Sequence, residues 1–79
     1  MNRERLLAKA RNKPRGLRFT ELCQLAEAFG WILDRQGGSH HIYLRQGVPG
    51  RVNVQPDRNR MAKEYQVRDL LKLIEEYGE

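Results

Sequence analysis

The sequence predicts an α+β fold in which a helix, a three-stranded antiparallel sheet and a second helix follow one another. Two segments, residues 20–29 and 64–77, carry apolar side chains at helical spacing. Between them lie three short runs rich in β-forming residues, 31–35, 40–45 and 51–55, separated by glycine-containing turns. Because these runs follow one another at hairpin distance, we expect a single antiparallel meander.

The first of the two helices has clear signals at both ends. We expect Thr20 to be its N-cap, with Glu21 in the first turn, where a carboxylate is favourable against the helix dipole. Phe19 precedes this cap and can pack back onto the first turn. Gly30 supplies the stop, so the predicted helix runs from about Thr20 to Phe29.

The last helix is predicted to be amphipathic. Val67, Leu70 and Ile74 lie on one of its faces, and Gly78 ends it. The two helices can then cover one face of the same sheet. Helix, three strands and helix is the layout of a double-stranded-RNA-binding domain, an analogy that concerns the fold alone.

Residues 1–16 predict an extra short helix ahead of these elements. Asn2 can cap it, Leu6 and Ala10 belong to its narrow apolar stripe, and Pro14 interrupts it. We therefore expect an N-terminal piece that docks on the body of the protein.

The length of the chain allows one domain. At 79 residues there is room for a single modest core. We expect residues 1–79 to form this domain, with residues 1–16 as a helical appendage and 17–79 as the core. No stretch approaches the roughly 20 apolar residues that span a bilayer, so we expect a cytoplasmic protein with no membrane partner. Its oligomeric state is not set by the sequence.

The charge balance points to a polyanionic partner. Fifteen Lys and Arg residues face ten Asp and Glu residues, which gives a net charge of +5. Nucleic acid fits this charge, although an anionic membrane surface or an acidic protein would fit it too. Arg58, Arg60 and Lys63 form a basic loop whose side chains are candidate phosphate contacts.

Both histidines of the chain, His40 and His41, follow directly after the turn Gly37-Gly38-Ser39. The glycines tolerate backbone angles that a side chain would forbid and let a large polymer approach closely. Histidine can take and give protons near neutral pH. This stretch is therefore a candidate site for acid–base chemistry.

RNA cleavage suits such a site because the ribose 2′-OH is already positioned as an internal nucleophile. A histidine can move the proton, and Arg or Lys can stabilise charge on the phosphate. We expect no metal ion and no other cofactor, because the chain has no carboxylate pair at two-metal spacing and adjacent strand residues point to opposite faces.

Strand alternation gives the two histidines different surroundings. His40 shares its parity with Ile42 and is expected at the margin of the helix-covered face. His41 shares its parity with Tyr43 and is expected on the wetter face, where Asn53 can join it. This pattern makes His41 the more accessible and His40 the better oriented. It does not indicate which of the two carries the acid–base chemistry.

The stretch Gly38-Ser39-His40-His41-Ile42-Tyr43 resembles the histidine motif of HicA toxins, which are small bacterial mRNA interferases. The resemblance extends in order over most of the chain, through residues 18–22, 28–31, 33–35, 53–56 and 62–77. It implies a double-stranded-RNA-binding-like fold, cleavage of mRNA and neutralisation by a HicB antitoxin.

The resemblance also implies roles for individual residues. The family's catalytic histidine directly follows the Gly-Gly or Gly-Ser pair, which maps onto His40. His41 then becomes a secondary candidate, together with Gly38, Ser39 and Tyr43, for contact with RNA. Two alternatives remain open from the residues themselves. One is a module that binds RNA duplexes without cutting them, and the other is a domain that binds only proteins.

Overall fold

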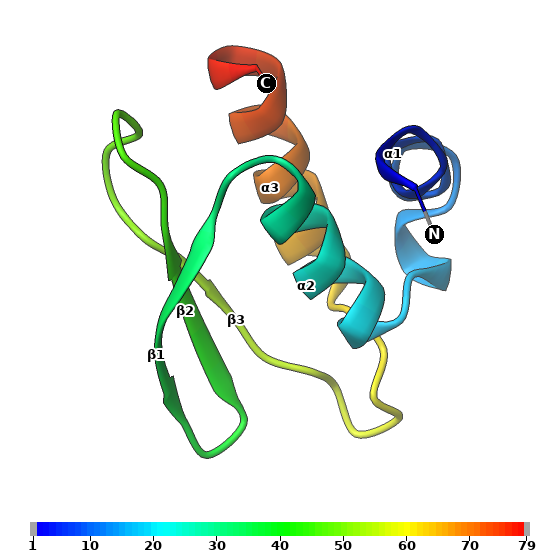
Figure 1. Ribbon diagram of the computed structural model, residues 1–79. Helices are drawn as coiled ribbons and strands as arrows, with labels where there is room; N and C mark the ends of the chain where they lie inside the picture. Colours follow the sequence, from blue (N-terminus) through cyan, green and yellow to red (C-terminus); the bar gives the residue numbers. More distant parts are fainter. Residues whose placement is uncertain (1, 79) are drawn as a thin grey trace.

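The computed structural model describes residues 2–78, which fold into three layers (Figure 1). Along the chain the elements are α1 (Arg3–Asn12), the 3₁₀ helix η1 (Pro14–Gly16), α2 (Phe19–Ala28), β1 (Ile32–Gly37), β2 (His40–Leu44), β3 (Val52–Val54) and α3 (Glu64–Tyr77). The sheet forms one outer layer, α2 and α3 form the middle layer, and α1 lies beyond them. The predicted α+β arrangement is confirmed.

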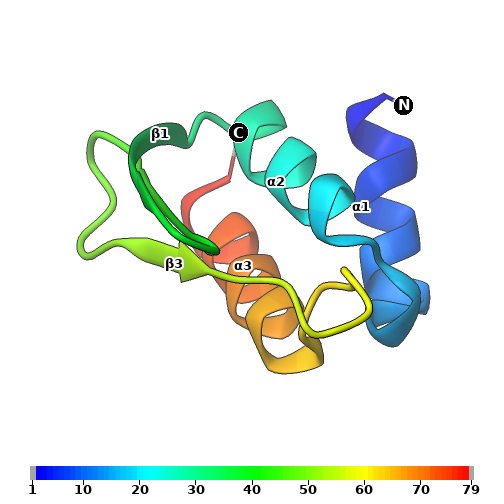
Figure 2. The same ribbon diagram turned by 90° about the horizontal axis from the view of Figure 1, so that it is seen from below.

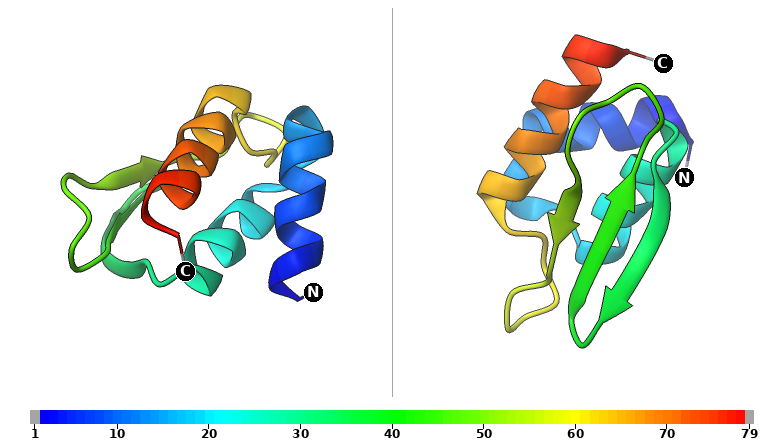
Figure 3. Two further views of the ribbon diagram at one scale, coloured as in Figure 1. Left: turned by 90° about the horizontal axis from the view of Figure 1, so that it is seen from above. Right: turned by 90° about the vertical axis from the view of Figure 1, so that its left-hand side faces the viewer.

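The three strands form one antiparallel sheet in the order β1-β2-β3, as a meander requires. β1 and β2 make a long hairpin, whereas β3 pairs over three residues only (Figure 3). The register of β1 shifts between Leu33 and Arg35, which leaves Asp34 as a bulge. All six residues of β1 are exposed, and Ile32 reaches 71%.

Both α2 and α3 cover the same face of the sheet (Figure 2). Apolar side chains of these two helices meet the inward-facing side chains of β2 and β3 in one core. Its largest fully buried side chains are Tyr43, Leu6, Leu17, Leu22, Leu25, Leu70 and Val67. Burial of side chains of this size is the main term that stabilises a chain this short.

α2 begins at Phe19, and the prediction that Thr20 caps it was wrong. Arg18 occupies the N-cap position, and the Glu21 carboxylate accepts a hydrogen bond from its backbone N–H at 2.9 Å. Phe19 joins the helix because its own N–H bonds to the carbonyl of Arg60 at 3.1 Å. Residues distant in sequence therefore set this boundary.

The junction of α2 and β1 is tied to the end of α3. Gly30 has φ +96°, and the Trp31 N–H reaches back to the Ala26 carbonyl at 3.0 Å, which closes the helix. The Arg45 guanidinium lies 5.0 Å from the centre of the Trp31 ring and donates to the Gly78 carbonyl at 2.8 Å. The Gly30 stop was predicted correctly.

α1 packs against both α2 and α3. Leu6 and Ala10 are buried in the common core, and Lys9 forms an ion pair with Glu21 at 2.9 Å. The Arg3 guanidinium lies 4.5 Å from the centre of the Phe29 ring. The first helix therefore contributes apolar side chains to the core in addition to surface contacts.

Candidate functional site

The turn between β1 and β2 presents the two histidines. Gly37 pairs with His40, so Gly38 and Ser39 form a two-residue loop. Gly38 has φ +59°, the left-handed geometry that a tight hairpin places at its first loop position. A side-chain carbon built on Gly38 would meet no atom within 4 Å. The tip of the hairpin is therefore open to a large ligand.

His41 and Tyr43 lie on the face that the helices cover, so the predicted faces of β2 were the wrong way round. Tyr43 is 1% exposed and pairs with Val52, while His41 pairs with Val54. Both valines are buried. Because adjacent residues of a strand point to opposite faces, His40 lies on the open face.

The error has a simple physical origin. Ile42 and Leu44 are as apolar as Tyr43, so the pattern of β2 alone does not distinguish its two faces. The register with β3 decides, because its two valines must lie against the helices. Ile42 and Leu44 remain partly exposed on the open face.

On the open face, His40 is exposed and hydrogen-bonded to Asn53. Its Nδ1 lies 3.2 Å from the Asn53 Oδ1. An amide oxygen only accepts hydrogen bonds, so His40 donates through Nδ1 and its Nε2 is free to accept a proton. Arg35 pairs with Ile42 and shares this face, diagonally adjacent to His40. Sequence reasoning missed Arg35 because only the register brings it here.

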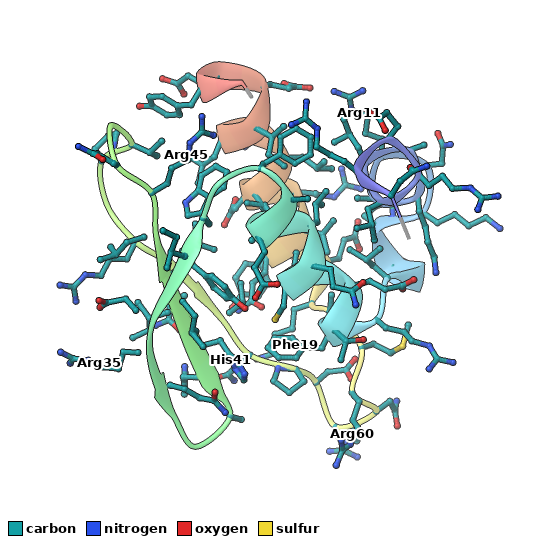
Figure 4. All side chains as sticks on the ribbon, in the orientation of Figure 1. Arg11, Phe19, Arg35, His41, Arg45 and Arg60 are labelled. Carbon is teal, nitrogen blue, oxygen red and sulfur yellow. The ribbon has the colours of Figure 1, made fainter. Side chains whose placement is uncertain are left out.

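On the covered face, His41 forms part of the wall of a groove. Its ring meets the Phe19 ring edge to face, with centroids 5.0 Å apart (Figure 4). Its Nδ1 lies 3.4 Å from the Ser39 carbonyl. The groove is a cavity of about 830 Å³ between the hairpin, one side of α2 and the loop that follows β3.

The loop that follows β3 is held by Asp57. One carboxylate oxygen of Asp57 accepts from the backbone N–H groups of Asn59, at 2.8 Å, and Met61, at 2.9 Å. Arg60 adopts φ 62°, and among residues 2–78 it is the one non-glycine residue with positive φ. The loop therefore presents the exposed side chains of Arg58 and Arg60 from a fixed backbone.

The wall of the groove that α2 forms carries a carboxylate, that of the exposed Glu27. The Tyr43 hydroxyl donates to the Glu27 Oε2 at 3.3 Å. Burial, together with the neighbouring Cys23 and Glu27, raises the pKa of Tyr43 well above its ordinary value. Burial likewise raises the pKa of the Cys23 thiol, which is therefore neutral and a poor nucleophile. Tyr43 acts here as a hydrogen-bond donor that fixes Glu27.

The groove gathers most of the residues that the sequence singled out. Its lining includes Gly38, Ser39, His41, Tyr43, Arg58 and Arg60, and it adds Phe19, Glu27 and Gln36, which the sequence analysis did not single out as site residues. His40 lies outside the groove on the open face. Lys63 also lies outside it, half-buried at the N-cap of α3.

The part of the chain that the structure describes holds neither a metal-binding cluster nor a helix suited to crossing a membrane. Within residues 2–78, no group of three or more His, Cys, Asp or Glu side chains is placed to hold a metal ion. None of the helices in this range is long and apolar enough to cross a membrane.

Together these features define a small basic α+β domain that presents two histidines from one hairpin, one on an open face and one in a groove. A family model described as the HicA toxin of bacterial toxin–antitoxin systems matches residues 19–75. The chain belongs to the HicA toxin family, and the resemblance in its sequence is confirmed. No curated protein and no solved structure gave a match. Membership of this family implies a toxin role and a cognate antitoxin as partner.

Proposed function

We propose that this chain is an endoribonuclease toxin that cleaves mRNA without a metal ion, with His40 as the proton-transfer residue. The observation that carries the proposal is the hydrogen bond between the His40 Nδ1 and the Asn53 Oδ1, 3.2 Å long. It fixes the ring in one tautomer and leaves Nε2 facing solvent on an open surface. A general base must first have its accepting atom within reach of the proton that it removes.

The chemistry follows from the tautomer. The Nε2 of His40 accepts the proton of a ribose 2′-OH, and the 2′-oxygen attacks the adjacent phosphorus. The bond from phosphorus to the 5′-oxygen breaks, and the leaving oxygen takes a proton from the imidazolium or from water. The products are a 2′,3′-cyclic phosphate and a 5′-hydroxyl end. The Arg35 guanidinium, on the same face, is the nearest candidate in register to stabilise the charge on the phosphate.

The first prediction tests His40 itself. We expect His40→Ala to lower the rate of RNA cleavage by about 10²–10⁴-fold, the usual contribution of general acid–base catalysis. The melting temperature should stay close to that of the wild type, because the side chain is exposed. Labelled RNA incubated with the pure protein in EDTA gives the rate and tests independence of metal ions at the same time.

His41→Ala is the matched comparison, since it removes the same group from the other face. We expect it to affect RNA binding more than the maximal rate. Full activity of His40→Ala would remove this residue from the mechanism, and loss of activity only in His41→Ala would move the chemistry to the groove. Retention of intact RNA by the wild type without cleavage would support the alternative, a non-catalytic double-stranded-RNA-binding module.

The partners of the proposed enzyme follow from its charge and its family. Its substrate is mRNA, its antitoxin is of the HicB type, and its place of action is the cytoplasm. A net charge of +5 favours an acidic antitoxin surface. Production of the chain alone should arrest bacterial growth, and co-production of the cognate HicB should restore it. Growth unaffected by the active protein would count against the toxin role of this chain.

A further inference from the structure

Proton transfer at His40 leaves the groove on the other face without a role. We propose that this groove holds one unstacked guanine of the RNA, with the Glu27 carboxylate as the residue that selects it. The proposal rests on the proposed function, because it assigns the base specificity of the same enzyme. The walls of the groove, the Glu27 carboxylate and the arginines of the loop after β3 each support it.

The size and the walls of the groove suit a nucleobase. Its volume of about 830 Å³ falls within the usual range for small-molecule sites, roughly 300–1,000 Å³. The half-buried His41 ring lines it and is held edge to face against the buried Phe19 ring, at a centroid distance of 5.0 Å. Proteins that read single-stranded RNA commonly stack bases on such rings. An extended apolar segment of a protein would leave the charged groups of this groove without partners.

The Glu27 carboxylate supplies the selectivity. Within residues 2–78, the one hydrogen bond that this carboxylate accepts comes from the Tyr43 hydroxyl at 3.3 Å, so its remaining acceptor positions are available to a ligand. An ionised carboxylate only accepts hydrogen bonds. Guanine presents two adjacent donors on its Watson–Crick edge, N1–H and the N2 amino group, which one carboxylate can accept together. Uracil presents a single donor between two carbonyl oxygens that would face the carboxylate unfavourably.

The rim of the groove suits the phosphate that accompanies a base. Arg58 and Arg60 both line the groove, and neither forms an ion pair with any other described residue. The Asp57 hydrogen bonds hold the backbone between them. A carboxylate on the α2 wall and two guanidinium groups on the loop after β3 match a nucleotide whose base contacts Glu27 and whose phosphate contacts the arginines.

The hairpin tip connects the groove to the proposed catalytic face. Gly38 and Ser39 line the groove, and His40 follows them directly on the opposite face. RNA that passes over this open tip would keep one base in the groove and bring a neighbouring phosphate to His40. The guanine should therefore occupy a fixed position relative to the cleaved bond.

Cleavage of a random-sequence RNA pool, followed by sequencing of the new 5′ ends, tests this. We expect the wild type to enrich guanine at one fixed position by roughly 5- to 150-fold, the discrimination that a bidentate contact to a base provides. Glu27→Gln should remove this preference and shift it towards adenine, because an amide offers one donor and one acceptor. Glu76→Gln, an exposed residue at the end of α3, removes the same charge and should leave the preference intact.

A second measurement does not depend on cleavage or on the folding of a Glu27 variant. The His40→Ala protein should bind an oligonucleotide with a single guanine more tightly than the same oligonucleotide with inosine, which lacks the N2 amino group. Equal affinities, or a guanine preference that Glu27→Gln leaves unchanged, would overturn the inference. If the wild type cleaves no RNA, the proposed function fails, and this binding comparison alone decides the role of the groove. If Glu27→Gln weakens antitoxin binding while base preference is unchanged, the groove is a protein interface and the inference is wrong.

Discussion

His40 and His41 are adjacent in the chain, but their surroundings in the fold differ. His40 is exposed and oriented by Asn53, whereas His41 is half-buried against Phe19. The hydrogen bond to Asn53 fixes the tautomer of His40, and the amide itself touches no reacting atom. Asn53 is thus a positioning residue for the proposed catalysis.

The second prediction tests this role. Asn53→Ala removes the acceptor for the His40 Nδ1–H, so the ring loses its fixed tautomer and orientation. We expect kcat to fall by about tenfold with little change in KM, because substrate contacts stay in place. Asn53→Asp keeps an acceptor at this position and should restore most of the rate. Asn12→Ala, on the exposed end of α1, is the control. A change in KM alone would place Asn53 in binding.

At the scale of elements, Glu21 joins α1 to α2. Partial burial acts to raise the pKa of its carboxyl, but the Arg18 N–H and the Lys9 ammonium outweigh burial, and the pKa is lowered. A carboxyl with a lower pKa in the folded than in the unfolded chain stabilises the fold at neutral pH. This contribution is lost as the pH falls through the folded-state value.

The third prediction follows from that sign. Glu21→Gln should lower the free energy of unfolding at pH 7 by roughly 1.5–3 kcal/mol, the size of a hydrogen bond to a charged group. The difference from the wild type should shrink progressively as the pH falls below about 4.5, where the wild-type carboxyl becomes protonated too. Urea unfolding across this pH range gives the measurement, with Glu76→Gln as control. A difference that is independent of pH would contradict the ion-pair explanation.

The loop after β3 gives the fourth prediction. Asp57→Ala removes a negative charge beside the basic rim, which by charge alone would strengthen RNA binding. It also removes the acceptor for two backbone N–H groups, so the loop should lose its fixed shape. We expect the second effect to win and RNA affinity to fall by about tenfold, as a filter-binding titration would measure. Asp69 is an exposed residue of α3, so Asp69→Ala makes the same change in charge without altering the loop and serves as the control. Tighter binding by Asp57→Ala would show that loop shape is unimportant.

At the scale of the whole molecule, the excess of positive charge should make RNA binding depend on salt. Replacement of both Arg58 and Arg60 by Gln removes two proposed phosphate contacts. The slope of log K against log salt should then fall in magnitude by about 1.4, since each contact to single-stranded RNA contributes about 0.7. The pair Arg5→Gln and Arg11→Gln, on α1, changes the net charge equally and should alter the slope much less. Equal changes in both double variants would place the binding surface elsewhere.

The sequence determines the elements of this fold better than it determines the site. Helical spacing at Val67, Leu70 and Ile74 and the stop at Gly30 are local signals, and the helices that they predict are present. The face of His41 depends instead on the register of β2 with β3. The strand pattern alone predicted the opposite face for His41, because both faces of β2 carry apolar residues.

The groove could be predicted from the sequence even less well than the face of His41. Phe19 and Glu27 come from α2 and Arg60 from the loop after β3, and only the packing of this loop against the start of α2 brings them to one groove. No local pattern in the sequence marks Glu27, because an exposed glutamate near a helix end is common. Its significance arises from the buried Tyr43 that donates to it.

The bulge at Asp34 bears on how readily the free edge of the sheet could pair with a strand of another chain. β1 is an edge strand with all of its side chains exposed, and such an edge is a template on which strands of other molecules can assemble. The extra residue twists the edge locally and interrupts its regular row of backbone donors and acceptors. The bulge therefore makes this edge a poorer template for a strand of a second copy than a regular strand of the same length would be.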